Sequence, residues 1–171
     1  MPTLGDRILK VNHAGEHGAV HIYAGQIAIA RVLAPGLVAE LEEFRAHEQR
    51  HRSIFAAELQ RRRCPRCRSY TLCALGGFVL GALTALLGAR AIAATTVAVE
   101  RVVLRHLDEQ LHVLKGQDPE AVTAIQTILS DEQQHHDQAA SRLQNPGPAL
   151  RLLQSLVALS TEAVIWLGMR L

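Results

Sequence analysis

The apolar residues of this chain recur every three or four positions, the spacing that places them on one face of an α-helix. One such face, between positions 41 and 59, also carries an acid and an imidazole in its middle. Its members are Leu41, Phe44, Glu48, His51, Phe55 and Leu59. A second face repeats the same steps at a constant offset of 84 in the numbering: Ile125, Ile128, Glu132, His135, Ala139 and Leu143. The pattern predicts two related helices, each with a Glu-x-x-His pair set into an apolar stripe.

Residues that interrupt helices divide the rest of the chain. Pro35-Gly36, Cys64-Pro65, Gly116 and Asn145-Pro-Gly-Pro148 mark the breaks, and Asp118-Pro119-Glu120 is typical of a helix start. The predicted helices span about 6–34, 37–62, 71–89, 91–115, 119–144 and 149–171. The first, second, fourth and fifth are expected to form a duplicated four-helix core. The third and sixth are apolar additions to it.

Composition supports an all-α fold. Strand-forming aromatic residues make up only 4% of the chain, whereas 49% is hydrophobic and largely aliphatic. A length of 171 residues predicts a single domain, and Asp6, Arg7 and Lys10 interrupt any apolar run that a signal peptide would need. A net charge of +2 gives no indication of nucleic-acid binding, so no such partner is expected.

The three cysteines, Cys64, Cys67 and Cys73, include one Cys-x-x-Cys pair. A structural zinc site needs a second pair of ligands, and no second cysteine pair follows. We therefore expect free thiols, as in a reducing compartment.

Two further acids follow the same repeat. Glu16 and Glu100 are related by the same offset, and each precedes its Glu-x-x-His pair by the same interval (16 to 48, 100 to 132). A Glu-x-x-His pair from each of two helices and one Glu from each of two others is the ligand set of di-iron and di-manganese helical bundles. Two divalent ions would neutralise the four carboxylates, whose burial is otherwise unfavourable. The predicted metal ligands are Glu16, Glu48, His51, Glu100, Glu132 and His135.

Two other interpretations account for some of these residues. His47-Glu48-x-x-His51 has the spacing of a zinc metalloprotease, but His47 lies about 90° from the centre of the apolar stripe. That interpretation also leaves the second Glu-x-x-His pair unexplained. Buried Glu and His can also satisfy each other as core ion pairs, but six matches under one offset make this a poor account. A ligating His needs a partner for its other nitrogen, and Asp131 or Asp137 is suited to that role.

Residues 71–89 carry no charge and follow a basic cluster. Three interpretations stay open: a helix lying in one membrane leaflet with arginines on anionic headgroups, a core helix, or a minimal membrane span. Gly77 and Gly81 suit close helix packing, and Gly15 and Gly18 of the first helix suggest a close neighbour as well. The apolar last helix is also able to meet lipid.

With these residues assembled, the chain resembles the demethoxyubiquinone hydroxylase family of ubiquinone biosynthesis. The matching segments cover nearly the whole chain in order. They are Asp6-Arg-Ile-Leu, His13-Ala-Gly-Glu16-x-Gly18-Ala, Ile22-Tyr-Ala-Gly-Gln26, Ala82-Leu-Thr-Ala-Leu-Leu-Gly88, Val97-Ala-Val-Glu100 and Asp131-Glu-x-x-His135-His-Asp137.

The resemblance implies a ferritin-like fold with two iron ions per chain. It implies Glu16, Glu48 and His51 around one iron, with the remaining three ligands around the other and some carboxylates bridging. The implied activity is a monooxygenase that uses dioxygen and an external reductant to hydroxylate the ring of a polyprenyl demethoxyubiquinol. The implied place is the cytoplasmic face of the cell membrane, bound peripherally, with other ubiquinone-biosynthesis proteins as partners.

Two positions depart from that family, which commonly has Tyr where this chain has His17 and Leu107. If electrons or protons reach the irons through a Tyr-His relay, Leu107 interrupts that relay.

A different class of function also stays open: a soluble ferritin-like protein that oxidises and takes up iron without an organic substrate.

Overall fold

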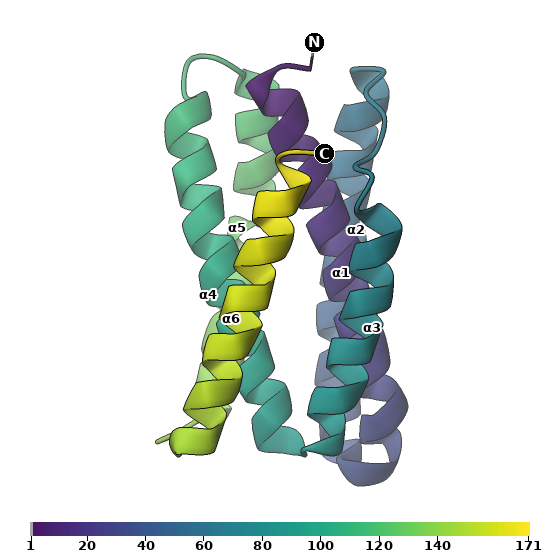
Figure 1. Cartoon of the computed structure of the whole chain (residues 1–171), viewed down its shortest axis with the longest axis vertical. Helices are drawn as coiled ribbons and strands as arrows, with labels where there is room; N and C mark the ends of the chain where they lie inside the picture. Colours follow the sequence, from purple (N-terminus) through teal and green to yellow (C-terminus); the bar gives the residue numbers. More distant parts are fainter. Residues whose placement is uncertain (1) are drawn as a thin grey trace.

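The computed structural model describes residues 2–171 and is all-helical over that range (Figure 1). Its helices are α1 (Leu4–Leu33), α2 (Val38–Arg61), α3 (Tyr70–Leu86), α4 (Ala89–Leu114), α5 (Pro119–Arg142) and α6 (Pro148–Gly168). Every predicted helix is present, with ends within three residues of the expected positions. The break at Pro35 contains a single 3-10 turn, Pro35–Leu37, which the sequence did not indicate.

Local sequence explains where several helices begin and end. Thr3 and Asp6 form a reciprocal capping box at the start of α1, with N···O distances of 2.9 and 3.1 Å. Asp118 caps α5 by accepting from the backbone N–H of Ala121, and a proline follows it at the first helical position. Gly88 and Gly116 adopt positive φ angles of 93° and 75° at the connections on either side of α4.

Two apolar layers fill the four-helix core of α1, α2, α4 and α5. The first contains Ile8, Leu9, Phe55, Leu59, Leu107, Leu114, Ile125 and Ile128. The second, towards the opposite ends of α1, α2 and α4, contains Tyr23, Ile27, Ala30, Leu41, Phe44 and Ile92. A third cluster, Ala93, Ala94, Val97, Ala139 and Leu143, continues this second layer on α4 and α5. The predicted metal ligands lie between the first layer and these two clusters along the four core helices. The all-α fold is confirmed, and its arrangement is consistent with a ferritin-like bundle.

Helix α3 packs on α1 so closely that their backbones touch. A Cβ atom at Gly81 would overlap the carbonyl oxygen of Ile22, and one at Gly77 would overlap the carbonyl oxygen of Gly18. The close packing expected at Gly18, Gly77 and Gly81 is therefore confirmed. The expectation for Gly15 was wrong, because within the described chain a Cβ there would meet no atom within 4 Å. Gly15 instead lines a cavity.

Helices α3 and α6 lie on the outside of the bundle (Figure 1), and their outer faces are apolar and exposed. Leu75 of α3 is 64% exposed and Leu159 of α6 is 68% exposed. Because only one edge of α3 is buried, the core-helix interpretation of residues 71–89 is wrong. By length and composition, α6 is the one helix within residues 2–171 that could cross a membrane, and 6% of its apolar window is buried. The further exposed large apolar residues of these two helices are Leu72, Phe78, Val79, Leu83, Leu86, Leu152, Leu156, Val164, Trp166 and Leu167.

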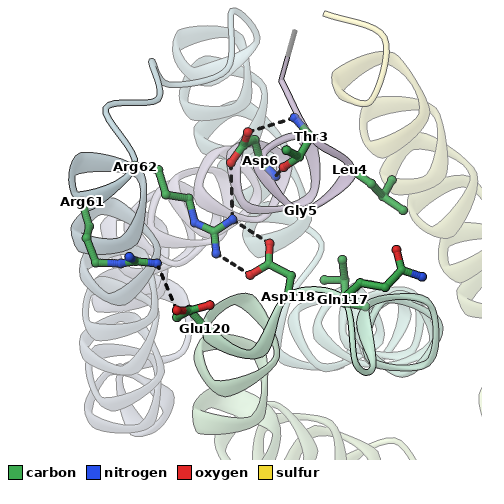
Figure 2. A pocket seen from close by; sticks show the side chains of 10 residues that line it. Thr3, Leu4, Gly5, Asp6, Arg61, Arg62, Gln117, Asp118 and Glu120 are labelled. Carbon is green, nitrogen blue, oxygen red and sulfur yellow. Dashed lines mark hydrogen bonds and ion pairs between the residues drawn. The ribbon is translucent and has the colours of Figure 1, made fainter.

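One guanidinium joins three helix ends (Figure 2). Arg62, next to the end of α2, donates two hydrogen bonds of 2.6 Å to Asp118 at the start of α5. It also donates to Glu58 at 2.5 Å and to Asp6 of α1 at 3.3 Å. The hydrogen bonds from Arg62 hold the pKa of Asp118 below its ordinary value, and Arg61 together with Arg62 lowers the pKa of Glu58.

The hydrogen bonds from Arg62 to these three acids predict that Arg62→Met loses stability in a pH-dependent way. Removing the cation leaves three carboxylates together, so we expect the free energy of unfolding to fall by about 2 kcal/mol near pH 7, less than for a fully buried pair. Carboxyl groups with lowered pKa values stabilise the fold above the ordinary carboxyl pKa of about 4, and that contribution disappears as the pH falls through the folded values. The difference from the wild type should therefore shrink below pH 4.

Urea unfolding between pH 3 and pH 7 measures this difference. Arg68→Met, at an exposed arginine in the same connection, is the matched control and should leave stability unchanged. A difference that stays constant over the whole pH range would show that Arg62 acts through packing of its stem instead of through charge.

Candidate metal centre

The four core helices bring all six predicted ligands into one buried cluster. Helices α1 and α4 contribute one glutamate each, and α2 and α5 contribute one Glu-x-x-His pair each. None of the six residues is more than 6% exposed. They are Glu16, Glu48, His51, Glu100, Glu132 and His135.

The cluster divides into two overlapping groups, each of four residues whose ligand atoms lie within 4.8 Å of one another. One group is Glu16, Glu48, His51 and Glu132, and the other is Glu48, Glu100, Glu132 and His135. Two carboxylates, Glu48 and Glu132, belong to both groups. Each group offers one imidazole and three carboxylates, a set that could hold a metal ion.

The donor atoms at the centre of the cluster face one another without hydrogen-bond geometry. Nδ1 of His51 lies 2.9 Å from Oε1 of Glu132, and Nδ1 of His135 lies 3.1 Å from Oε1 of Glu48. All four atoms are buried, and none has a hydrogen-bond partner within the described residues. Unsatisfied buried polar atoms are unfavourable, whereas converging carboxylate and imidazole lone pairs suit a divalent cation. The residues present therefore fit a metal centre.

The Nε2 atoms of His51 and His135 point away from the cluster, and each contacts one further residue. These two residues occupy corresponding positions of the internal repeat. Nε2 of His51 donates to Oδ2 of Asp131 at 3.0 Å, as expected for one of the two candidate aspartates. Asp137 instead contacts its neighbours on the same helix. Nε2 of His135 lies 3.0 Å from Nδ1 of His47, a contact that sequence reasoning missed. The signal was present, because positions 47 and 131 are related by the repeat offset.

The position of His47 argues against the protease interpretation, which needs this residue as a zinc ligand. Neither metal-capable group found among residues 2–171 contains His47, and its Nδ1 is directed at an imidazole nitrogen.

A second missed residue is Tyr23. Its hydroxyl donates to Oε1 of Glu100 at 3.0 Å from a buried position. Burial, followed by the nearby charge of Glu100, raises the pKa of Tyr23 well above its ordinary value, so the phenol stays protonated. Its counterpart in the repeat is Leu107, which is buried and shares a cavity with Glu16.

The pKa values within the cluster show that it does not tolerate four negative charges by itself. Burial, and then the charges of Glu48 and Glu132, raises the pKa of Glu16 well above its ordinary value. Burial and Glu132 do the same for the pKa of Glu100. Burial alone would lower the pKa of His51, but the adjacent carboxylates of Glu132 and Glu48 outweigh it and raise that pKa to about 10. Positive charge at the centre is strongly favoured.

An apolar cavity of about 550 Å³ reaches the cluster between α1, α3, α4 and α6. Its lining includes the carboxylate-bearing residues Glu16, Glu48, Glu100 and Glu132. Its walls include Leu72, Val79, Leu80, Leu83, Val99, Val103, Leu107, Val164 and Ile165. Polar groups are few, and among them Asn12 and Gln110 exchange amide hydrogen bonds of 2.8 and 3.0 Å.

A second hollow lies on the other side of the bundle between α2 and α5. Its lining includes the polar residues Gln49, Arg50, Ser53, Asp131 and His51 itself, together with Ala46 and Ile54. His51 is thus adjacent to a hollow with charged and polar side chains in its lining, whereas the four carboxylates are adjacent to the apolar cavity.

The two positions that depart from the resembled family have different surroundings. His17 stacks on Tyr70 of α3, with ring centroids 3.8 Å apart, and Arg52 lies 3.1 Å from its Nδ1. Burial, His21 and Arg52 lower the pKa of His17 to about 4. Leu107 lies in the apolar core. The cysteines form no disulfide within residues 2–171, in agreement with the expected free thiols.

Fold and cluster together define an all-helical bundle with a buried carboxylate–histidine centre. The chain belongs to the family described as ubiquinone biosynthesis protein COQ7, whose sequence model matches residues 3–168. This finding confirms the resemblance inferred from the motifs.

Three curated relatives agree with that membership. The chain is 34% identical over 169 residues to the mouse protein named NADPH-dependent 3-demethoxyubiquinone 3-hydroxylase, mitochondrial. That alignment covers 96% of this chain and 77% of the mouse protein. It is 34% identical over 170 residues to the human protein of the same name, with 97% and 77% covered. It is 33% identical over 168 residues to the 3-demethoxyubiquinol 3-hydroxylase of Rhodospirillum rubrum, with 98% and 79% covered.

A metal centre and a set of structural ion pairs predict opposite effects of Glu16→Gln. Without metal, removing one of four clustered acids relieves repulsion, so the variant should be at least as stable as the wild type. A bound ion stabilises the folded state by about 3 kcal/mol when its concentration is a hundredfold above Kd. Because Glu16→Gln has lost one ligand, ferrous ion should stabilise the variant less than it stabilises the wild type.

Thermal unfolding under anaerobic conditions, with and without Fe²⁺, measures both effects. Glu43→Gln, at an exposed acid of α2, is the control and should behave as the wild type. If Glu16→Gln is less stable than the wild type to the same extent with and without iron, the cluster is structural.

Proposed function

We propose that this chain is a di-iron monooxygenase that hydroxylates the ring of a polyprenyl demethoxyubiquinol in ubiquinone biosynthesis. The observation that carries the proposal is the buried cluster of unsatisfied carboxylate and imidazole atoms beside an apolar cavity. The names of the mouse and Rhodospirillum rubrum relatives support the reaction and the substrate. We also propose that residues 1–171 form one ferritin-like domain.

In this proposal two iron ions bind per chain. Glu16 and His51 would hold one ion and Glu100 and His135 the other, and Glu48 and Glu132, which belong to both groups, would be available to both. When bound, the iron pair supplies the redox chemistry that activates dioxygen, with one oxygen atom entering the ring and the other leaving as water. An external reductant is required, and the names of the mammalian relatives suggest NADPH as its source.

The protein's own part is to orient the quinol ring and exclude water. The cavity between α1, α3, α4 and α6 is lined mostly by aliphatic side chains, which suits an apolar ring and keeps the site dry. Asn12 and Gln110 offer amide groups to the ring oxygens. This lining also favours the hydroxylase over an iron-uptake protein, because an apolar cavity serves no purpose for hydrated iron.

We further propose that the protein binds peripherally to the cytoplasmic face of the cell membrane. The exposed apolar faces of α3 and α6 border the cavity, so an isoprenoid tail can stay in lipid while the ring reaches the cluster. Exposed arginines before α3, Arg66 and Arg68, are available to anionic headgroups. Other ubiquinone-biosynthesis proteins are the expected partners.

The reaction is tested in a bacterial host that lacks its own demethoxyubiquinone hydroxylase. The wild-type chain should restore ubiquinone, and Glu132→Gln should leave the demethoxy intermediate accumulated at least a hundredfold over wild-type levels, because a bridging ligand is lost. Mass spectrometry of extracted quinones measures both species. Glu43→Gln should complement as the wild type does. Normal ubiquinone in cells with folded Glu132→Gln, or no rescue by the wild type, would refute the proposed reaction.

If α3 and α6 attach the protein to the membrane, an acidic residue placed on their exposed faces should weaken membrane binding, whereas one placed elsewhere should not. Leu75→Glu combined with Leu159→Glu should reduce binding to anionic liposomes at least tenfold, since each exposed leucine contributes roughly 1.5–3 kcal/mol when buried in lipid. Val113→Glu, at an exposed apolar residue of α4, is the control and should bind normally. Liposome flotation measures binding. Equal binding by all three proteins would rule out these faces as the attachment surface.

A further inference from the structure

The two halves of the cluster are related by the internal repeat, yet their immediate surroundings differ at two repeat-related pairs of positions. Asp131 supports His51, whereas His47, its counterpart in the repeat, supports His135. Tyr23 donates to Glu100, whereas its counterpart, Leu107, lies in the apolar core. These differences bear on the order in which the two halves fill, an inference that rests on the proposed metal centre.

The half that contains His51 has a carboxylate behind its imidazole. Asp131 accepts the Nε2–H proton, which leaves the Nδ1 lone pair directed at the cluster and makes the ring a stronger donor to a cation. Arg50 contacts the same carboxylate at 3.3 Å, but its side chain is 57% exposed, so solvent screens much of its charge. This half therefore has one additional negative charge close to the ion site.

The half that contains His135 has a neutral group in the same place. Nδ1 of His135 faces Oε1 of Glu48, so the proton of a ligating His135 ring is on Nε2. Nδ1 of His47, 3.0 Å away, then accepts that proton's hydrogen bond with an uncharged lone pair. An imidazole acceptor polarises the donor ring less than a carboxylate does. His47 positions the ring of His135 but adds no negative charge.

Tyr23 also makes the half that contains His135 the weaker ligand set. A hydrogen bond from the hydroxyl of Tyr23 withdraws electron density from the carboxylate of Glu100, which makes it a weaker ligand. The corresponding side chain in the other half, Leu107, has no donor to offer Glu16. Both differences thus strengthen the donors of one half and weaken those of the other.

We infer that the two metal positions are unequal. The position held by Glu16 and His51 fills first and more tightly, and the position held by Glu100 and His135 fills second. Partners behind a ligating residue typically change metal affinity 10- to 100-fold. The two binding steps should therefore be separated by at least about tenfold.

Anaerobic titration of the purified full-length chain with Co²⁺, followed by absorption and calorimetry, resolves the two steps. The wild type should bind two ions with dissociation constants at least about tenfold apart. Glu16→Gln should weaken the tighter step, and Glu100→Gln should weaken the looser step while the tighter one persists. The opposite assignment, or two equal steps in the wild type, would overturn the inference. Fewer than two ions bound to the wild type would instead refute the proposed metal centre.

Two further variants test the residues behind the asymmetry. His47→Asp makes the two halves alike at this position and should tighten the second step about tenfold or more, closing the gap. Tyr23→Phe removes the hydroxyl with little change in shape and should also tighten the second step. Glu42→Gln, at an exposed acid of α2 that contacts Arg31, is the control for charge on this helix and should leave both constants unchanged. If the folded Tyr23→Phe and His47→Asp variants both keep the wild-type gap, these residues do not set the order of filling.

Discussion

The burial of four carboxylates and two imidazoles between apolar layers is the constraint on which the rest of this structure depends. Each buried ion loses several kcal/mol of hydration, and the donor atoms at the centre of this cluster have no hydrogen bonds within the described chain to offset that loss. Phe44 and Tyr23 close the cluster on one side, and Leu9 and Phe55 close it on the other. The surrounding side chains therefore do not supply the missing partners, and positive charge at the centre offsets the buried carboxylates.

Much of this arrangement could be predicted because it repeats. A single offset in the numbering relates the helices, the Glu-x-x-His pairs and the single glutamates, and helical periodicity then places all of them on inward faces. The same offset also relates Asp131 to His47 and Tyr23 to Leu107, yet these pairs are hard to recognise because their members differ in chemistry. An internal repeat reveals a partner only when both copies keep the same residue type.

Features that depend on residues far apart in the chain, without a repeat, could not be predicted. Arg62 joins Asp6 and Asp118, each 56 residues away, and no periodicity connects these positions, although Glu58 lies one helical turn before Arg62. The glycines of α3 indicate close packing, but only the structure shows that Gly18 and Ile22 of α1 are the neighbours, while Gly15 opens onto a cavity. Likewise, composition could not decide which face of residues 71–89 is covered.

Helices α3 and α6 explain why a duplicated core has two different sides. Helix α3 packs on α1 and helix α6 packs on α4 (Figure 1). The apolar cavity is lined by residues of these four helices. The opposite side, between α2 and α5, keeps its polar surface, and its hollow reaches His51 and Asp131. A lipid-soluble ring and water-soluble species would thus approach the same cluster from opposite directions. The repeat supplies the same ligand residues from both halves of the chain. The two additional helices, and the residues that differ between the halves behind those ligands, make the two sides of the cluster unlike.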